Sequence, residues 1–573
     1  MSYRSENSGG SSGGRRYGKG PPRGGSYGGG GGGGRSGGRG PRRDESRSGP
    51  PRGRSGQGRY GDDARDPRDV ADQQDRERDA ARQADDDLSP AMPRTPIGTN
   101  ARQVAFGTLL EAAYSHEYVT EHLDRAFQQA NLPQIERRLA TELAYGVVRR
   151  KNTLDAMLQS VVTRERENVE PALWMLLRIG AYQLALCDGI AEHAACDETV
   201  ELARWLDRPE WIGFTNGVLR GITRLLAPEP IEEPLPFSLP MTNGRFRKLA
   251  QPVFADVAQN PLAYVSKGFS VPHWLVERWA ERFDFAELCR LGFWFNTPSS
   301  LCLRVHSLRT DRDSLLALFA ENGISAHAGE LSTSMWLDGA SPRVDQLPGF
   351  ADGWFVVQDE SAQQAAKLLA PQPGQLVLDL CSAPGTKTTH LAELMNNEGR
   401  IIATDSSESR LQLVQQNSQR LGLSIIETAV ISQEGTNIPA GPFDAILIDA
   451  PCSNTGVLGK RPDARWRIQP DDLEELSRIQ LRLLMAAADR VRPGGRIVYS
   501  TCSIEPEENR QVVEAIRHFR PKLTIAEMHD HLPGKPADGG FQCLLRMAED
   551  CGFKAKRWAA FTFDPINGVH SFA

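Results

Sequence analysis

The second half of the chain alternates short apolar segments with helical patterns, and no other feature limits the possible folds as strongly. Apolar runs that predict strands lie at residues 376–380, 401–404, 445–448 and 496–500. Strands that alternate with helices predict a doubly wound, mainly parallel sheet of the α/β class. Because ligands bind at the carboxyl ends of the strands in such sheets, the residues after each strand are the candidates for a site.

A turn of small residues follows the first of these strands. It comprises Cys381, Ser382, Ala383, Pro384, Gly385, Thr386 and Lys387, and a helix is expected to begin near Lys387. Small residues let the backbone approach a ligand closely, and the first turn of a helix offers free N–H groups. The turn matches neither the GxGxxG pattern nor the GxxxxGK[ST] phosphate loop. It indicates a nucleotide-like cofactor: a dinucleotide, a phosphate or the amino-acid part of S-adenosylmethionine.

The second strand leads into Asp405, about 20 residues beyond the glycine of that turn. An acid at this place is the usual partner of ribose hydroxyls in such folds. The alternative is that Asp405 caps the helix that follows it. The spacing favours the ribose ligand.

Two cysteines follow the third and fourth strands. Asp449 and Cys452 come after residues 445–448, and Cys502 comes after residues 496–500. A single cysteine at such a place would be expected as a small core residue. Two cysteines at the ends of separate strands, one of them close to an aspartate, predict a site instead.

A thiolate and a carboxyl group in one site suit methylation of cytosine at C5. C5 is too weak a nucleophile to attack a methylsulfonium, but a thiolate that adds to C6 makes C5 enamine-like. A carboxyl group can hold or protonate N3 during this addition, after which the C5 proton leaves and the thiolate is expelled. The thiolate must be accessible with a lowered pKa, and a base inside a stem must be flipped out.

Three segments resemble the RNA (cytosine-5)-methyltransferases. They are residues 379–385 (DLCSAPG), 449–456 (DAPCSNTG) and 501–509 (TCSIEPEEN), and residues 357–363 (VQDESAQ) look like the segment ahead of that family's cofactor domain. The helical segments 142–149 and 216–220 are similar to NusB-like RNA-binding domains. The combination of a NusB-like domain with these methyltransferase segments, over residues 97–545, resembles the B-type bacterial 16S rRNA (cytosine-5)-methyltransferases. It implies a Rossmann-like class I methyltransferase domain with S-adenosyl-L-methionine as cofactor.

The resemblance also implies roles for the residues at the strand ends. Cys502 matches the family's nucleophile, and Cys452 matches the second cysteine, which helps to release the methylated product. Asp449 matches an acid near the target base and the cofactor. Residues 381–387 match the loop around the methionine portion of the cofactor, and Asp405 matches the ribose ligand. In DNA cytosine-C5 methyltransferases the cysteine of the Pro-Cys motif is the nucleophile, so the presence of both cysteines favours RNA.

The chain departs from the family pattern at several places. Thr386 stands where the family generally has glycine, which implies a less open loop. The family usually has an aspartate near the adenine, where residues 431–433 of this chain are ISQ, with Glu427 and Glu434 as candidate substitutes. Residues 538–541 (DGGF) fit the family's Asp-Gly-Phe-Phe-like segment only loosely. Residues 546–573 are expected to be a C-terminal extension without a counterpart.

Composition and periodicity divide the remainder of the chain. Residues 1–96 form a Gly/Arg-rich arm and an acidic linker, which are expected to be disordered because they have too few apolar residues to build a core. Residues 97–226 predict an all-α NusB-like bundle. Residues 227–269, with five prolines between residues 228 and 240, predict a linker. Residues 270–350 predict a small α/β subdomain that positions RNA, and residues 351–545 form the methyltransferase domain.

Charge is concentrated in the arm. The net charge of the chain is −6, but residues 1–60 carry 13 Lys/Arg against 3 Asp/Glu, and residues 61–90 carry 5 Arg against 11 Asp/Glu. The arm is expected to add salt-sensitive, sequence-independent affinity for RNA, and the alternative is a solubilising tail.

The cysteine pattern and the lack of long apolar runs limit the class of protein. Nine scattered cysteines favour reduced thiols over disulfides or a metal site. We expect a cytoplasmic monomer that acts on 16S rRNA and binds no DNA, membrane or metal. Two alternatives stay open: a tRNA cytosine-C5 methyltransferase, and a non-catalytic NusB-like RNA-binding assembly or antitermination factor.

Overall fold

The computed structural model of this chain describes residues 95–549, except residues 116, 243, 340–342, 433–436 and 536. The expected arm up to residue 94 and the C-terminal extension beyond residue 549 lie outside the described residues and stay predictions. No helix within the described ranges is long and apolar enough to cross a lipid bilayer.

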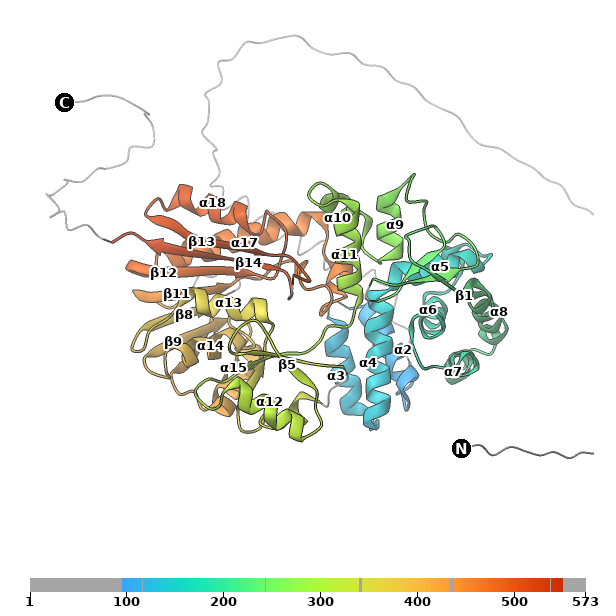
Figure 1. The fold of residues 1–573 in the computed structure, drawn as a ribbon, viewed down its shortest axis with the longest axis horizontal. Helices are drawn as coiled ribbons and strands as arrows, with labels where there is room; N and C mark the ends of the chain where they lie inside the picture. Colours follow the sequence, from blue (N-terminus) through green and yellow to red (C-terminus); the bar gives the residue numbers. More distant parts are fainter. Residues whose placement is uncertain are drawn as a thin grey trace, which may run out of the picture. The chain divides into compact units, whose positions relative to one another are not determined.

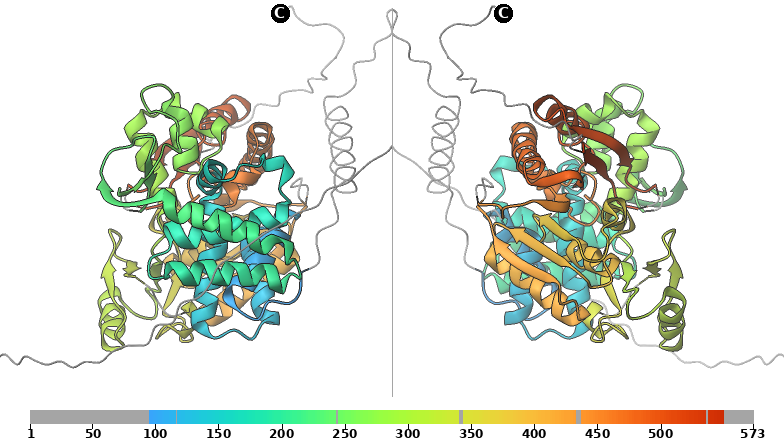
Figure 2. Two further views of the ribbon diagram at one scale, coloured as in Figure 1. Left: turned by 90° about the vertical axis from the view of Figure 1, so that its right-hand side faces the viewer. Right: turned by 90° about the vertical axis from the view of Figure 1, so that its left-hand side faces the viewer.

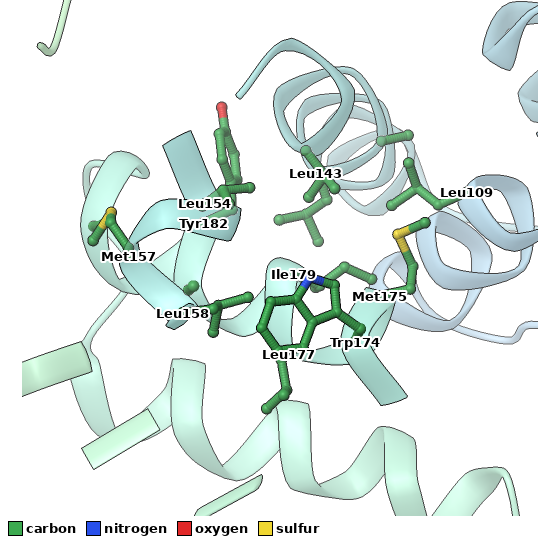
Figure 3. Packing of buried hydrophobic residues seen from close by; sticks show 14 of the residues in the cluster. Leu109, Leu143, Leu154, Met157, Leu158, Trp174, Met175, Leu177, Ile179 and Tyr182 are labelled. Carbon is green, nitrogen blue, oxygen red and sulfur yellow. The ribbon is translucent and has the colours of Figure 1, made fainter. Parts of the chain in front are cut away.

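A helical bundle forms the first described part of the chain, as predicted. Its helices are α2 (Ala101–Ala113), α3 (Val119–Gln129), α4 (Gln134–Arg149), α5 (Lys151–Val161), α6 (Pro171–Leu186), α7 (Glu192–Trp205) and α8 (Glu210–Leu225), with a short 3-10 helix at Arg166–Asn168. Helix α6 is buried on most sides because it is apolar nearly all round. Figure 3 shows its side chains packed against those of α2, α4 and α5; the labelled residues are Leu109, Leu143, Leu154, Met157, Leu158, Trp174, Met175, Leu177, Ile179 and Tyr182.

The expectation that residues 227–269 are a linker is wrong. They contain the antiparallel strands β1 (Leu226–Ile231), β2 (Ser238–Pro240) and β3 (Phe246–Leu249), followed by α9 (Pro261–Gly268). The strand order is β1-β3-β2, so Pro228 and Pro240 lie on edge strands, where a residue without an N–H group is tolerated. The central strand β3 has no proline. Helices α10 (His273–Ala280) and α11 (Phe285–Asn296) follow.

A small antiparallel sheet with one α-helix comes next. It comprises β4 (Cys302–Val305), α12 (Arg312–Glu321), β5 (Ala326–Ala328), β6 (Ser334–Leu337) and β7 (Phe355–Val357), with a 3-10 turn at Val344–Gln346. The strand order is β5-β6-β4-β7, so the sheet extends past the boundary expected at residue 350. Leu315 and Phe319 of α12 pack on Leu303 and Phe355 of the sheet.

A seven-stranded sheet forms the C-terminal part, and it confirms the predicted doubly wound fold. Its strands are β8 (Leu376–Leu380), β9 (Arg400–Asp405), β10 (Ile426–Val430), β11 (Phe443–Asp449), β12 (Val491–Thr501), β13 (Leu523–His531) and β14 (Gly540–Met547). The order is β10-β9-β8-β11-β12-β14-β13, with β8 to β12 parallel and β14 antiparallel to both of its neighbours. The direction of winding reverses between β8 and β11, where such folds bind ligands.

Helices cover both faces of this sheet (Figure 1). They are α13 (Glu360–Leu369), α14 (Thr386–Leu394), α15 (Glu408–Leu421), α17 (Pro470–Ala488) and α18 (Arg510–Phe519), with the short α16 (Ala464–Arg467) after β11. Because side chains alternate along a strand, Ala445 and Leu447 pack against α13 and α14, whereas Ile446 and Ile448 pack against α17 and α18. The sheet is therefore apolar on both sides, as a parallel sheet requires.

One continuous core joins the bundle to the loops at the strand ends. Leu458, Ala464 and Ile504, which follow β11 and β12, belong to the same apolar cluster as the bundle and α9–α11. In Figure 2 the bundle helices face the viewer in the left view, and the strands of the large sheet face the viewer in the right view. The loops after β11 and β12, which carry Cys452 and Cys502, are thus held by the sheet on one side and by the helical region on the other. We call them the two cysteine loops.

Candidate active site

Strands β11 and β12 are neighbours in the sheet and bring Cys452 and Cys502 together. The strands run parallel with Asp449 opposite Ser500, and the backbone N–H of Ala450 donates to the carbonyl of Ser500 at 2.9 Å. Each cysteine therefore lies just past the end of its strand. The two Sγ atoms are 3.2 Å apart, and both half-buried thiols line one cleft.

The two thiols differ in acidity because of their surroundings. The hydrogen bond from Cys452 lowers the pKa of Cys502 most strongly; burial and Asp449 oppose it, and the positive charges of Arg461 and Lys387 support it. The same hydrogen bond, together with burial, raises the pKa of Cys452. Cys502 is therefore the more acidic thiol of the pair, and Cys452 keeps its proton.

Asn454 contacts both the acidic thiol and a cation. Its Oδ1 accepts hydrogen bonds from Cys502 Sγ at 3.2 Å and from Arg461 Nη1 at 3.1 Å. Its Nδ2 donates to the carbonyl of Cys452 at 2.9 Å. The residue has a φ of 61°, in the left-handed region that asparagine adopts more readily than most residues. The sequence assigned no role to either residue: Asn454 lies within the segment 449–456 but was given no function there, and Arg461 lies outside the quoted segments.

Glu508 connects the two cysteine loops. Its buried carboxylate accepts the backbone N–H of Ser453 at 2.8 Å and the hydroxyl groups of Ser453 and Ser503. The backbone N–H of Gly456 also donates to the carbonyl of Cys502 at 3.0 Å. These bonds hold the separation of the two sulfur atoms.

Glu505 attaches the second cysteine loop to helix α10 and the residues just after it. This fully buried carboxylate accepts from Nε of Arg278 at 2.7 Å, Nε1 of Trp279 at 2.9 Å and Nη2 of Arg282 at 3.3 Å. Three donors satisfy a buried charge that would otherwise be costly. Helix α10 and the residues just after it, which belong to the subdomain expected at residues 270–350, thus orient the loop that carries Cys502.

Lys387, in the first turn of α14, reaches across to the end of β11. Its Nζ lies 2.6 Å from Oδ2 of Asp449. Burial opposes protonation, but Asp449, Cys502 and Asp379 together favour the charged form, so the pKa of Lys387 is raised overall. Two residues that the sequence predicted for the same site are therefore an ion pair, because β8 and β11 are adjacent strands.

The turn between β8 and α14 requires its glycine. Gly385 has a φ of 95°, and a Cβ atom there would lie 3.0 Å from Cα of Val414. Thr386, which stands in place of the expected glycine, begins α14, and its carbonyl accepts a hydrogen bond from Arg304 Nη1 of β4 at 2.6 Å. A threonine fits because the first helical position needs no positive φ. Arg304 is fully buried and also pairs with Glu393 of α14 at 2.7 Å.

A cleft of about 850 Å³ collects most of the predicted site. The predicted residues that line it are Cys381, Ala383, Pro384, Thr386, Lys387, Asp405, Asp449, Cys452 and Cys502; Ser382 and Gly385 do not. Burial raises the pKa of the Cys381 thiol to about 12, so this third cysteine stays neutral.

The residues of the cleft fit S-adenosylmethionine. The glycine turn allows close approach, and Asp405 and Asp449 offer carboxylates to a cationic ligand. The buried hydroxyl of Ser382, in the same turn, has no hydrogen-bond partner among the described residues. The volume is in the range of pockets that bind nucleotide-sized ligands.

Asp405 lies at the tip of β9, and its role as a cap is excluded. The N-cap of α15 is Ser407, whose side chain accepts from the backbone of Arg410, while Asp405 Oδ1 accepts from the backbone N–H of Ser407 at 3.1 Å. The carboxylate is buried and lines the cleft. This position is compatible with the predicted ribose contact.

Glu427 is the wrong candidate for the adenine contact. It lies within β10 rather than at its end, and it pairs with Arg400 at 2.6 Å on the exposed surface. Glu434 lies outside the described residues. Ile431 and Ser432, which follow β10, line the cleft instead.

Family models match three regions of the chain. The model of the 16S rRNA methyltransferase RsmB/F matches residues 366–546, the NusB family matches residues 99–224, and the RsmF/B-like ferredoxin-like domain matches residues 271–342. The three matches follow the large sheet, the helical bundle and the small sheet described above. The methyltransferase model covers the turn at residues 381–387 and both cysteine loops.

Several curated relatives match most of the chain. A probable ribosomal RNA small subunit methyltransferase B of Synechocystis sp. is 36% identical over 420 residues, 72% of this chain and 88% of the relative. Its namesake in Bacillus subtilis is 32% identical and covers 79% of this chain and 97% of the relative. The ribosomal RNA small subunit methyltransferase B of Salmonella typhi is 34% identical over 74% of this chain and 91% of the relative.

A solved structure shares the fold. The crystal structure of PH0851 matches with a TM-score of 0.63 and 24% identity, over 79% of this chain and 100% of that chain. Fold, family models and curated relatives agree, and they confirm the resemblance drawn from the strand-end motifs. The chain is a methyltransferase of the ribosomal RNA small subunit methyltransferase B family, and its cofactor is S-adenosyl-L-methionine.

Proposed function

We propose that the chain methylates C5 of a cytosine in 16S rRNA and that Cys502 forms a transient covalent bond to C6 of that base. The 3.2 Å contact between the sulfur atoms of Cys452 and Cys502, close to Asp449, carries the proposal. Two thiols of unequal acidity suit a reaction in which a thiolate first adds to a ring and is later expelled. The small-subunit rRNA substrate is the one named for the relatives.

In the first step, the Cys502 thiolate donates an electron pair to C6 of the cytosine, the C5–C6 π electrons move towards C5, and negative charge develops at N3. N3 takes up a proton from solvent, and the Asp449 carboxylate, held by Lys387, accepts a hydrogen bond from the N3–H group. When bound, S-adenosylmethionine supplies an electrophilic methyl group to C5. The C5 proton then leaves to a base, and its electron pair re-forms the C5–C6 double bond as the bond from C6 to sulfur breaks.

Cys452 acts in the release step. Because its pKa is raised, the thiol keeps its proton and donates a hydrogen bond to the departing Cys502 thiolate. Without that bond the leaving thiolate is less stable, and the covalent adduct persists. The two cysteines therefore have separable effects.

The test compares wild type, Cys502→Ala and Cys452→Ala after incubation with S-adenosylmethionine and 16S rRNA. We expect Cys452→Ala to retain a protein–RNA adduct on denaturing gels, and Cys502→Ala to transfer no methyl group. Methyl transfer by Cys502→Ala at the wild-type rate would refute the covalent step. A parallel incubation with tRNA separates the two RNA substrates.

Two further measurements separate the substrate from the chemistry. Bisulfite mapping of 16S rRNA from a strain without this protein should show one unmethylated cytosine that is methylated in the parent. Calorimetry should show S-adenosylmethionine binding. A protein that binds RNA but neither binds the cofactor nor changes the bisulfite map is the non-catalytic RNA-binding factor.

A further inference from the structure

Tyr118, at the start of helix α3, lies in the wall of the catalytic cleft although it belongs to the helical bundle. It lines the cleft together with Cys452, Cys502 and Asn454. The tyrosine is half-buried, so part of its ring is open to the cleft. The bundle therefore contributes a side chain to the place where the reacting base must lie.

The backbone around Tyr118 is held against the loop that follows Cys452. The N–H of Val119 donates to Asp463 Oδ2 at 2.8 Å. Arg467 of α16 donates to the carbonyl of Ser115 at 3.4 Å and to the carbonyl of Glu117. Contacts on both sides of residue 118 place its side chain at the thiol end of the cleft.

The environment of the ring identifies which end of the cleft it faces. Burial raises the pKa of Tyr118, and Arg461, Asp463, Arg467 and Cys452 are the other groups that influence it. All four lie in the segment between β11 and α17, and none belongs to the turn at residues 381–387. The hydroxyl group stays protonated at neutral pH, so the ring is neutral.

Arg467 supports the ring from one side. Its guanidinium carbon lies 5.0 Å from the ring centroid, within the range of a cation–π contact. A ring fixed in this way is a preorganised stacking surface, and every nucleobase has a face that can stack on it. Attack on C6 requires the plane of the cytosine to be held at a fixed angle to Cys502.

We propose that Tyr118 stacks on the part of the flipped target base that is remote from C5 and C6, and so orients the base for attack by Cys502. Tyr118 is thus a positioning residue that the helical bundle supplies to the active site of the methyltransferase domain. The inference rests on the proposed cytosine chemistry. It gives the bundle a direct part in the reaction in addition to any contact with the rest of the RNA.

The test measures how fast the covalent adduct forms in the Cys452→Ala background, with enzyme in excess over 16S rRNA. We expect Tyr118→Ala to slow adduct formation by about 5- to 150-fold, the effect of removing an aromatic stacking partner. Tyr118→Phe should keep the rate within about twofold of the Cys452→Ala parent, and Tyr118→Leu should resemble Tyr118→Ala, because leucine fills space without stacking. Tyr145→Ala is the matched control, since Tyr145 is a half-buried bundle tyrosine that does not line the cleft.

The outcomes distinguish a stacking role for the Tyr118 ring, a role for its hydroxyl group, and no role in adduct formation. An unchanged rate in Tyr118→Ala, or equal rates in the phenylalanine and leucine variants, would overturn the stacking role. A loss in Tyr118→Phe as large as in Tyr118→Ala would assign the effect to the hydroxyl group and also overturn it. Calorimetry of S-adenosylmethionine binding and the melting temperature check that each variant is folded. If the Cys452→Ala parent forms no adduct at all, the proposed function fails first, independently of Tyr118.

Discussion

Cys452 Sγ and Cys502 Sγ lie 3.2 Å apart at the ends of two neighbouring parallel strands, although 50 positions separate them in the chain. The contact is asymmetric. One hydrogen bond lowers the pKa of Cys502 and raises that of Cys452. Similar side chains at similar places in the sheet thereby acquire different chemistry, and this difference can be measured without RNA.

The first prediction concerns alkylation of the free enzyme by iodoacetamide. Only a thiolate reacts, so Cys502 should be modified before Cys452 at neutral pH. Cys452→Ala removes the hydrogen bond that lowers the pKa of Cys502, so the pH midpoint of Cys502 alkylation should rise. Peptide mass spectrometry across a pH series measures it. Cys196→Ala, in helix α7, should leave the midpoint unchanged; the same midpoint in Cys452→Ala would contradict the assignment.

The second prediction concerns the cation beside the same thiol. Lys387→Gln removes the ion pair with Asp449 and a positive charge that lowers the pKa of Cys502. Methyl transfer should fall by about tenfold or more at neutral pH and recover in part as the pH is raised, because the thiolate then forms without the cation. A pH–rate profile measures this shift. Lys367→Gln, an exposed lysine of α13, should keep the wild-type profile.

The third prediction concerns the buried ion pair between the small sheet and α14. Arg304→Ala leaves Glu393 buried without its cation, so the free energy of unfolding should fall by about 3–5 kcal/mol. The affinity for S-adenosylmethionine should fall as well, because the carbonyl of Thr386 loses one of its donors and keeps only the weaker contact with Thr389 Oγ1 at 3.1 Å.

Denaturant titration measures the loss in Arg304→Ala, and two variants test its cause. Arg304→Met with Glu393→Gln removes both charges and should recover part of the lost stability. Arg343→Ala breaks an exposed pair with Asp345 and should cost about 0–1 kcal/mol. Equal losses in Arg304→Ala and Arg343→Ala would show that the buried ion pair contributes no more to the free energy of unfolding than the exposed one.

The fourth prediction concerns Asp379 at the end of β8. Burial raises the pKa of this carboxyl from 3.8 to about 7, against a hydrogen bond from Thr388 Oγ1 at 2.6 Å. Because the folded pKa is the higher one, the unfolded chain ionises first. Asp379 therefore reduces stability as the pH rises from about 4 to about 7, by at most about 1.4 kcal/mol per pH unit.

Asp379→Asn removes that titration. The variant should gain stability relative to wild type as the pH rises through this window, with the gain constant above about pH 7. Denaturant titrations without cofactor at several pH values measure the difference. Asp345→Asn, at an exposed position, should show a nearly constant difference; a constant difference in Asp379→Asn would mean that the carboxyl titrates normally.

The sequence determined the fold class, the bundle and most of the cleft. These follow from local patterns: apolar periodicity places the strands and helices, and the carboxyl ends of parallel strands meet at one edge of the sheet. Asp449, Cys452 and Cys502 were therefore predictable as neighbours without coordinates. The prediction of a linker at residues 227–269 was wrong, because prolines occur both in linkers and on the edge strands of a sheet.

Only the tertiary structure decided how these residues act on one another. The separation of the two sulfur atoms depends on Glu508 and Glu505. Glu508 binds the loop that carries Cys452, and Glu505 binds α10 and the residues just after it. The contact of Arg304 with Thr386 and the place of Tyr118 in the cleft join segments far apart in the chain. A pKa or a packing contact depends on distances in space, often of a few ångströms, and residue spacing along the chain does not specify them.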